Sequence, residues 1–190
     1  GVIFADQWNN LANRMAHYNT TGPEIWAQTD GKVDGFICSM GTGGTISGTS
    51  IFLREQRKDI TIGLADPMGA AMYSHFAHGE LKSEGNSIPE GIGLGRVTPM
   101  NEDITVDNPY QVTDQEAIPI IFNLLKEEGL CLGGSSGINV AGAIKLAKDM
   151  GPGHTIVTIL ADAGNRYQSK LFNPEFLRSR DLPVPEWLDN

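Results

Sequence analysis

Short apolar runs alternate along the chain with segments in which apolar residues recur every three or four positions. Short runs predict buried strands, and the wider spacing predicts helices with one apolar face. We expect strands at residues 2–5, 33–39, 60–65, 104–107 and 155–160, and a shorter apolar run at 130–132. We expect helices at residues 11–18, 24–28, 49–57, 70–78, 114–128 and 138–150, and a last short helix after residue 162. This alternation predicts an α/β fold, a parallel sheet flanked by helices.

Local signals mark both ends of one expected helix. Thr113 and Glu116 have the spacing of a capping box, in which each side chain binds the backbone N–H of the other residue. Gly129 is suited to the position just after a helix, where the left-handed conformation is common. Pro119 is unfavourable there, because its missing N–H breaks a helical hydrogen bond. We expect the helix to begin after Thr113 and to end before Gly129.

Charge and apolar content argue against two classes of partner. The formal net charge is −9, and a strongly acidic chain is poorly suited to bind nucleic acid. No apolar run approaches the length that spans a bilayer. Residues 1–8 also lack the basic start and long apolar core of a signal peptide. We therefore expect neither nucleic acid nor membrane as a partner.

The two cysteines indicate the redox environment. Cys38 and Cys131 each lie among apolar residues and are far apart in sequence, so we expect both to be buried and unpaired. Unpaired thiols are typical of a reducing compartment, and we expect a cytoplasmic protein, with association with mitochondria as the alternative. Neither the cysteines nor the four histidines have the spacing of a metal site, so no metal is expected.

The most informative stretch is residues 39–48, Ser-Met-Gly-Thr-Gly-Gly-Thr-Ile-Ser-Gly, between an expected strand and an expected helix. Such a turn can point several backbone N–H groups at one anion, and the helix N-terminus adds partial positive charge. Thr42 and Thr45 can add hydroxyl donors. We interpret the stretch, called the cradle below, as a phosphate site. The alternative is an ordinary glycine-rich turn.

Two familiar phosphate motifs do not fit the cradle. A Walker A loop needs a lysine after its last glycine, but Gly48 is followed by Thr49. The dinucleotide fingerprint G-x-G-x-x-G fails because Ile46 occupies the position of its third glycine. A small ligand with a single phosphate suits this short turn better.

Polar residues follow other expected strands as well. Ser135 and Ser136 come after the run at 130–132, and Asp162 follows the strand at 155–160. In a parallel sheet, ligands bind beyond the carboxyl ends of the strands. We therefore expect these residues and the cradle to meet at one site.

Residues 41–48 resemble the phosphate loop of the pyridoxal-phosphate enzymes of the cysteine synthase and cystathionine beta-synthase group. Residues 20–26, 90–93 and 127–137 are similar to further segments of that family, in the same order. The segment 166–174 looks like a subgroup close to cysteine synthase A. The resemblance covers nearly the whole chain, and it implies the tryptophan-synthase-beta fold (fold type II) with pyridoxal 5′-phosphate as cofactor.

The resemblance assigns the phosphate to the cradle. Backbone N–H groups and hydroxyls would hold it at Gly41, Thr42, Gly43, Gly44 and Thr45. Glycine allows the backbone to approach the anion closely.

Four further positions match residues that face the cofactor ring or the substrate in this family. Ser135 would hydrogen-bond the pyridine nitrogen, with the neighbouring Ser136 as the alternative. Gln7 would help to hold the substrate carboxylate, unless it is a solvated loop residue. Gly91 and Gly93 would line the substrate side.

Two of the polar residues also have structural interpretations. Ser135 could be the N-cap of the following helix, because serine is common there. Asp162 could lie near the cofactor ring or cap the last short helix, and the cap is the preferred interpretation.

The lysine that holds the cofactor as a Schiff base in this family is absent, because no lysine of this chain lies in the family's lysine motif. The family's threonine-rich loop for the substrate carboxylate is absent too. We therefore expect a C-terminal portion of such an enzyme, with a pyridoxal-phosphate-binding domain at residues 1–172 and a tail at 173–190. It would be inactive alone, with no catalytic residue of its own. It would need the lysine-bearing segment as a partner, and the complete enzyme would be a homodimer.

For the complete enzyme the resemblance implies a β-replacement that makes cysteine from O-acetyl-L-serine and sulfide. A neutral serine beside the ring nitrogen leaves that nitrogen unprotonated, which favours β-elimination and replacement. One alternative is a lyase similar to cystathionine beta-synthase or to serine/threonine dehydratase. The other is a non-catalytic fragment that binds pyridoxal phosphate or a partner protein.

Overall fold

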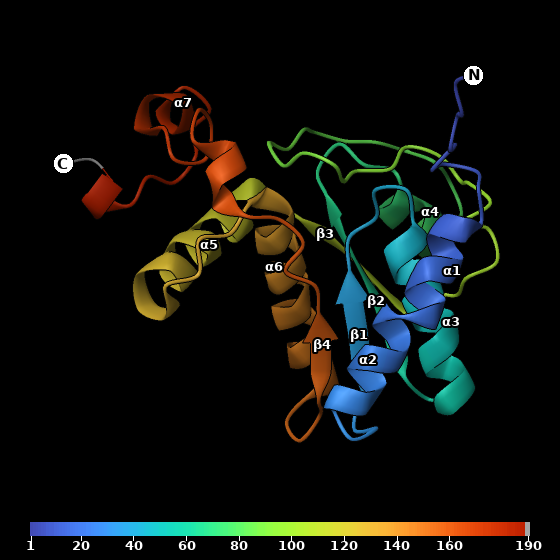
Figure 1. Ribbon diagram of the computed structural model, residues 1–190. Coiled ribbons are helices and arrows are strands. Elements are labelled where there is room, and N and C mark those ends of the chain that lie inside the picture. The colour runs from blue at the N-terminus through green and yellow to red at the C-terminus, as the bar shows by residue number, and fades with distance from the viewer. Residues whose placement is uncertain (189–190) are drawn as a thin grey trace.

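A four-stranded parallel sheet forms the centre of the computed structural model, which describes residues 1–188 (Figure 1). Its strands are β1 (Gly35–Cys38), β2 (Thr61–Pro67), β3 (Asn108–Val112) and β4 (Ile156–Thr158). They lie in the order β3-β2-β1-β4, and every neighbouring pair is parallel. The expected α/β fold with a parallel sheet is confirmed.

Helices alternate with these strands along the chain. They are α1 (Ala12–Asn19), α2 (Thr21–Gln28), α3 (Gly44–Gln56), α4 (Met72–His78), α5 (Asp114–Glu128), α6 (Gly134–Met150) and α7 (Pro174–Arg178). Two short 3-10 helices are η1 (Gly164–Tyr167) and η2 (Glu186–Leu188). No helix within residues 1–188 combines the length and the apolar character needed to cross a bilayer.

The sheet separates two apolar layers. Side chains of a strand alternate between its two faces, and in β1 they enter different clusters. Phe36 and Cys38 belong to a cluster on the side of α2, α3 and α4, whereas Ile37 packs with residues of α5 and α6. All four residues of β1 are buried. Helices therefore cover both faces, α1 to α4 on one side and α5 and α6 on the other (Figure 1).

The expected capping box is present at the start of α5. Thr113 Oγ1 accepts from the backbone N–H of Glu116, and the Glu116 carboxylate accepts from the backbone N–H of Thr113. Gly129 has a φ of 70° and ends the helix in the left-handed conformation. Pro119 lies inside α5, beyond its first turn.

The C-terminal segment packs against α5 rather than against the sheet. A third apolar cluster joins the two and contains Ile118, Ile121, Phe122, Tyr167, Leu171, Leu177 and Leu182. Residues 189–190 of the expected tail lie outside the described residues. The division of the chain at residue 172 stays a prediction.

Three expected strands are wrong. Residues 2–5 form no strand, and Val2, Ile3 and Phe4 are 100%, 92% and 83% exposed. An apolar run becomes a strand only beside a partner strand, and the described residues supply none there. The run at 130–132 makes only a single antiparallel bridge, from Leu132 to Ala163.

The strand expected at 104–107 lies instead at 108–112, as β3. Pro109 argues against a strand in the sequence because it cannot donate to a sheet ladder. It is tolerated because β3 is an edge strand, where one side needs no donors.

The two cysteines differ in their surroundings. Cys38 is buried in β1, and burial raises the pKa of its thiol to about 12. Cys131 is exposed, so the expectation of a buried residue is wrong. It follows α5 outside the sheet, where apolar neighbours in sequence do not guarantee an apolar environment in space.

Candidate functional site

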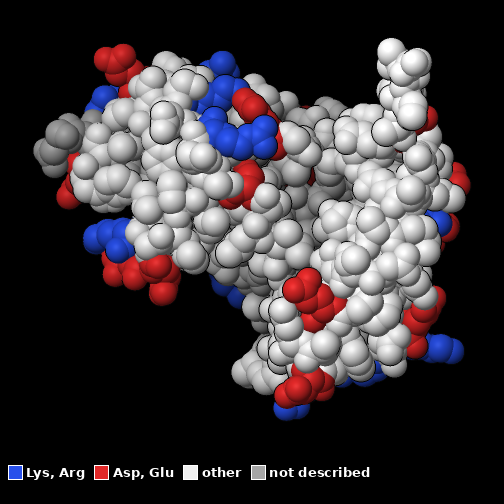
Figure 2. All heavy atoms as spheres, in the orientation of Figure 1, with Lys and Arg blue, Asp and Glu red and all other residues white. Residues whose placement is uncertain are grey.

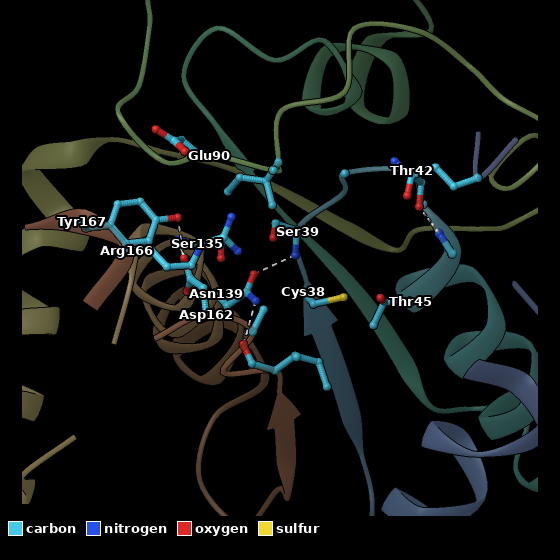
Figure 3. A pocket seen from close by; sticks show the side chains of 18 residues that line it. Cys38, Ser39, Thr42, Thr45, Glu90, Ser135, Asn139, Asp162, Arg166 and Tyr167 are labelled. Carbon is cyan, nitrogen blue, oxygen red and sulfur yellow. Dashed lines mark hydrogen bonds between the residues drawn. The ribbon is translucent and has the colours of Figure 1, made fainter. Parts of the chain in front are cut away.

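A cavity of about 460 Å³ opens at the carboxyl ends of the strands. In the space-filling view a hollow separates the part of the molecule formed by α5 and α7 from the part formed by α1 to α4 (Figure 2). Four segments separated in sequence line most of the cavity: the cradle, the loop 90–92, the start of α6, and residues 159–167 (Figure 3).

Most of the residues singled out in the sequence meet at this cavity. Its lining includes Gln7, Gly41, Thr42, Gly43, Gly44, Thr45, Gly91, Ser135 and Asp162. Gly93 lines a smaller neighbouring pocket instead, and its N–H donates to Met40 O at 2.9 Å. The functional roles assigned to these residues stay predictions.

The cradle turns directly from β1 into α3. Gly43 has a φ of 93°, in the left-handed region that favours glycine, and α3 begins at Gly44 without a side-chain cap. A Cβ atom on Gly41 would lie 2.3 Å from Gly91 O, so the cradle and the loop 90–92 touch through backbone alone. The N-cap residue therefore has no side chain to cap α3, and the side-chain contact of its first N–H is a long one, from Gly44 N to Thr42 Oγ1 at 3.4 Å.

Helix α1 supports the cradle from the other side. Asn13 Nδ2 donates to Thr42 Oγ1 and to Gln7 O, each at 2.8 Å. A Cβ atom on Gly44 would lie 2.1 Å from Asn13 Oδ1, so only glycine allows this approach. Sequence reasoning missed Asn13, and no local pattern identifies it.

Asp162 organises the start of α6. Its carboxylate accepts from Ser135 N at 3.2 Å, Ser136 N at 2.9 Å, Ser136 Oγ at 2.7 Å and the Tyr167 hydroxyl at 2.7 Å. The carboxylate of Asp162 therefore offsets the partial positive charge of the α6 N-terminus at the edge of the cavity.

These contacts correct two interpretations. Asp162 does not cap the last short helix, because the N-cap of η1 is Ala163, which makes no side-chain cap bond. Ser135 is not an N-cap either, since Gly133 holds that position in α6. Ser135 lies in the first turn and is buried, on the lining of the cavity.

The contacts also set the titration of both partners. Burial works to raise the pKa of Asp162, but hydrogen bonds from Ser136 and Tyr167 hold it below its usual value. Burial and the hydrogen bond to Asp162 raise the pKa of Tyr167 to about 12. At neutral pH the pair is an ionised carboxylate and a neutral phenol.

We expect Asp162→Asn to lower the free energy of unfolding at pH 7 by about 2 kcal/mol, because charge-assisted hydrogen bonds are lost. The folded-state pKa is lowered, so the stabilisation is complete above the unfolded value of about 3.9 and is lost as the pH falls through the folded value. Urea titrations at pH 7 and near pH 3 should therefore show a smaller acid effect in the variant. The control is Asp30→Asn, an exposed aspartate; equal effects of the two substitutions would contradict the prediction.

Asn139 joins the two strands that end at the cavity. Its Oδ1 accepts from Ser39 N at 2.7 Å, and its Nδ2 donates to Ile159 O at 2.7 Å (Figure 3). Sequence reasoning missed this residue. The available signal was an amide on the same helical face as Ser135, four positions later.

Within residues 1–188, no group of three or more His, Cys, Asp or Glu side chains is arranged to hold a metal ion. No lysine is among the described residues that line the cavity. Lys170 lies near its edge, where its Nζ pairs with Glu90 Oε1 at 2.5 Å.

Comparison with known proteins matches residues 1–162 to the family described as pyridoxal-phosphate dependent enzyme. The chain is 45% identical to cysteine synthase 2 of Schizosaccharomyces pombe, covering 98% of this chain and 51% of that protein. It is 44% identical to cysteine synthase 1 of Neurospora crassa, over 98% of this chain and 52% of that protein. The chain therefore spans about half the length of these curated relatives.

A solved structure is also similar. It is the O-acetylserine dependent cystathionine beta-synthase from Helicobacter pylori, with a TM-score of 0.79 and 30% identity. The match covers 86% of this chain and 51% of that one.

Proposed function

Because the chain belongs to the family of pyridoxal-phosphate-dependent enzymes, we propose that its cavity holds the phosphate and ring of pyridoxal 5′-phosphate. The observation that carries the proposal is the contrast between two helix N-termini at one cavity. The Asp162 carboxylate occupies the start of α6, whereas the N-cap of α3 is Gly43, which makes no side-chain cap bond, and Gly44 N–H has only a 3.4 Å contact to the neutral Thr42 hydroxyl. An anion is stabilised at an open helix N-terminus.

The residues present fit this cofactor. The backbone N–H groups of the cradle line the cavity at a place where Gly41 leaves no room for a Cβ atom. Thr42 and Thr45, which carry hydroxyl groups, line the same cavity. We propose that these groups bind the phosphate and that the Ser135 hydroxyl hydrogen-bonds the ring nitrogen. Gln7 and Gly91 line the same cavity and would contact the amino-acid substrate, whereas Gly93 lines a smaller neighbouring pocket.

The proposed reaction is the replacement of the acetate of O-acetyl-L-serine by sulfide, which gives cysteine. Bound pyridoxal phosphate supplies an electron-withdrawing ring that acidifies the α-proton of an amino acid. The residues of this chain would orient that ring and shield it from water. Support comes from the names of the relatives, which are cysteine synthases.

A second reaction is favoured by one specific observation. The similar solved structure is an O-acetylserine dependent cystathionine beta-synthase. The same bound amino acid could then react with a larger thiol in place of sulfide. The two reactions share the donor substrate and differ only in the acceptor.

We propose that the lysine which anchors the cofactor and moves the α-proton belongs to a segment outside this chain. The complete protein would then be the catalyst, as a homodimer in the cytoplasm or with mitochondria. A chain that binds pyridoxal phosphate without catalysis is the remaining alternative.

The test begins with purification of the chain together with any polypeptide that accompanies it. Mass spectrometry would identify a partner that carries a lysine motif. The assembled protein should release acetate and form cysteine from O-acetyl-L-serine and sulfide, and should do so faster than it condenses serine with homocysteine. The isolated chain should turn over neither pair, and borohydride fixation of the cofactor onto one of its own lysines would overturn the assignment of the lysine to another segment.

A further inference from the structure

A hydrogen-bonded row of side chains leads from α2 through α1 to the cradle. His17 lies between two threonines, with Nδ1 2.9 Å from Thr21 Oγ1 and Nε2 3.2 Å from Thr45 Oγ1. The imidazole is half-buried, and burial lowers its pKa. None of the roles assigned above uses this histidine.

The direction of these hydrogen bonds decides what Thr45 can offer the cavity. A hydroxyl has one proton, and a neutral imidazole has one N–H and one bare nitrogen. If Nε2 of His17 were bare, it would accept the only proton of Thr45, and lone pairs alone would face a bound phosphate. If Nε2 carries a proton, it donates to Thr45, whose own proton remains free.

A bound anion favours the arrangement in which Nε2–H of His17 donates to Thr45. Thr45 lines the cavity beside the glycines of the cradle (Figure 3), and a phosphate accepts hydrogen bonds at all its oxygens. The bare Nδ1 of a neutral His17 can then accept from the Thr21 hydroxyl. The Thr21 hydroxyl then donates to His17, His17 donates to Thr45, and the Thr45 hydroxyl is free to donate to a bound phosphate.

We propose that His17 is a positioning residue for the cofactor phosphate. Its Nε2–H donates to Thr45 and thereby turns the hydroxyl proton of Thr45 into the cavity. The inference rests on the proposed function, because only a bound phosphate makes this direction matter.

The protonation of His17 is measured directly by NMR. The chain is labelled with ¹⁵N in its histidine rings, and a long-range ¹H–¹⁵N spectrum is recorded with saturating pyridoxal 5′-phosphate. His17→Gln identifies the signals of His17 by their loss. We expect Nε2 to be protonated in the bound chain. A bare Nε2 with ligand bound would overturn the inference.

Affinity for pyridoxal 5′-phosphate, measured by fluorescence titration, provides the second test. His17→Leu should weaken binding about tenfold, the effect of about one net hydrogen bond, whereas His17→Gln keeps an N–H donor and should stay within about threefold of wild type. Inorganic phosphate alone should give the same ranking.

A double substitution separates positioning from a general packing effect. If His17 acts through Thr45, adding His17→Leu to Thr45→Val should weaken binding no further. A further tenfold loss in the double variant would overturn the inference. Absence of any affinity of the wild-type chain for pyridoxal 5′-phosphate or phosphate would overturn the proposed function as well, so the two failures are distinguishable.

Discussion

Replacement of Gly41 by alanine is expected to weaken the binding of pyridoxal 5′-phosphate about a hundredfold. The new Cβ atom would lie 2.3 Å from Gly91 O, and a backbone atom cannot move aside as the end of a side chain can. The cradle must shift, and the loss of two charge-assisted hydrogen bonds of about 1.5 kcal/mol each corresponds to that factor. Fluorescence titration of the chain measures the change.

The matched control is Gly95→Ala. A Cβ atom on Gly95 meets nothing within 4 Å, and the residue needs no left-handed backbone. The affinity of the Gly95→Ala variant for pyridoxal 5′-phosphate should equal that of wild type. Circular dichroism and urea unfolding check that the Gly41 variant is folded, with a loss of about 1–3 kcal/mol from overpacking. A folded Gly41→Ala chain with wild-type affinity would show that the phosphate does not bind at the cradle.

Asn139→Leu is expected to lower the free energy of unfolding by about 3 kcal/mol. Asn139 is 1% exposed, and its removal leaves Ser39 N–H and Ile159 C=O without their partner. Each buried polar group left unpaired costs about 1–3 kcal/mol. The substitution is similar in size and apolar, so the effect arises from the lost hydrogen bonds rather than from a cavity. Urea unfolding followed by circular dichroism measures it.

Lys148→Ala provides the control on the same helix, because Lys148 is exposed. It should change the free energy of unfolding by no more than about 0.5 kcal/mol. The Asn139 variant should also bind the cofactor more weakly, since Ser39 begins the cradle. A loss below about 1 kcal/mol would mean that water replaces the amide at both strand ends.

The sequence patterns predict the sheet and the cradle because both depend on local rules. Strand β1 appears as an apolar run, and the box at Thr113 and Glu116 lies within four residues. The position of the cavity beyond the strand ends then follows from the geometry of parallel sheets. These features need no knowledge of distant contacts.

The supporting contacts could not be predicted in this way. Asp162 binds the start of α6 from 26 and 27 residues away, and Asn13 reaches Thr42 across 29 residues. No periodic pattern encodes such pairs, because each depends on how two elements are placed by the rest of the core. The prediction of a strand at residues 2–5 is wrong for the same reason, because whether an apolar run is buried depends on the elements packed around it.

The position of β4 beside β1 has a consequence for synthesis on the ribosome. Thr155, which directly precedes β4, donates its N–H to Asp34 Oδ2, 121 residues earlier in the chain. The ribosome therefore synthesises the cradle long before β4, the strand that pairs with β1, and before Asp162, which follows β4. Closing so long a loop is slow compared with local helix formation. The cavity is thus among the last features expected to form, and a nascent chain released before residue 156 would contain the cradle but lack β4 and Asp162 beside it.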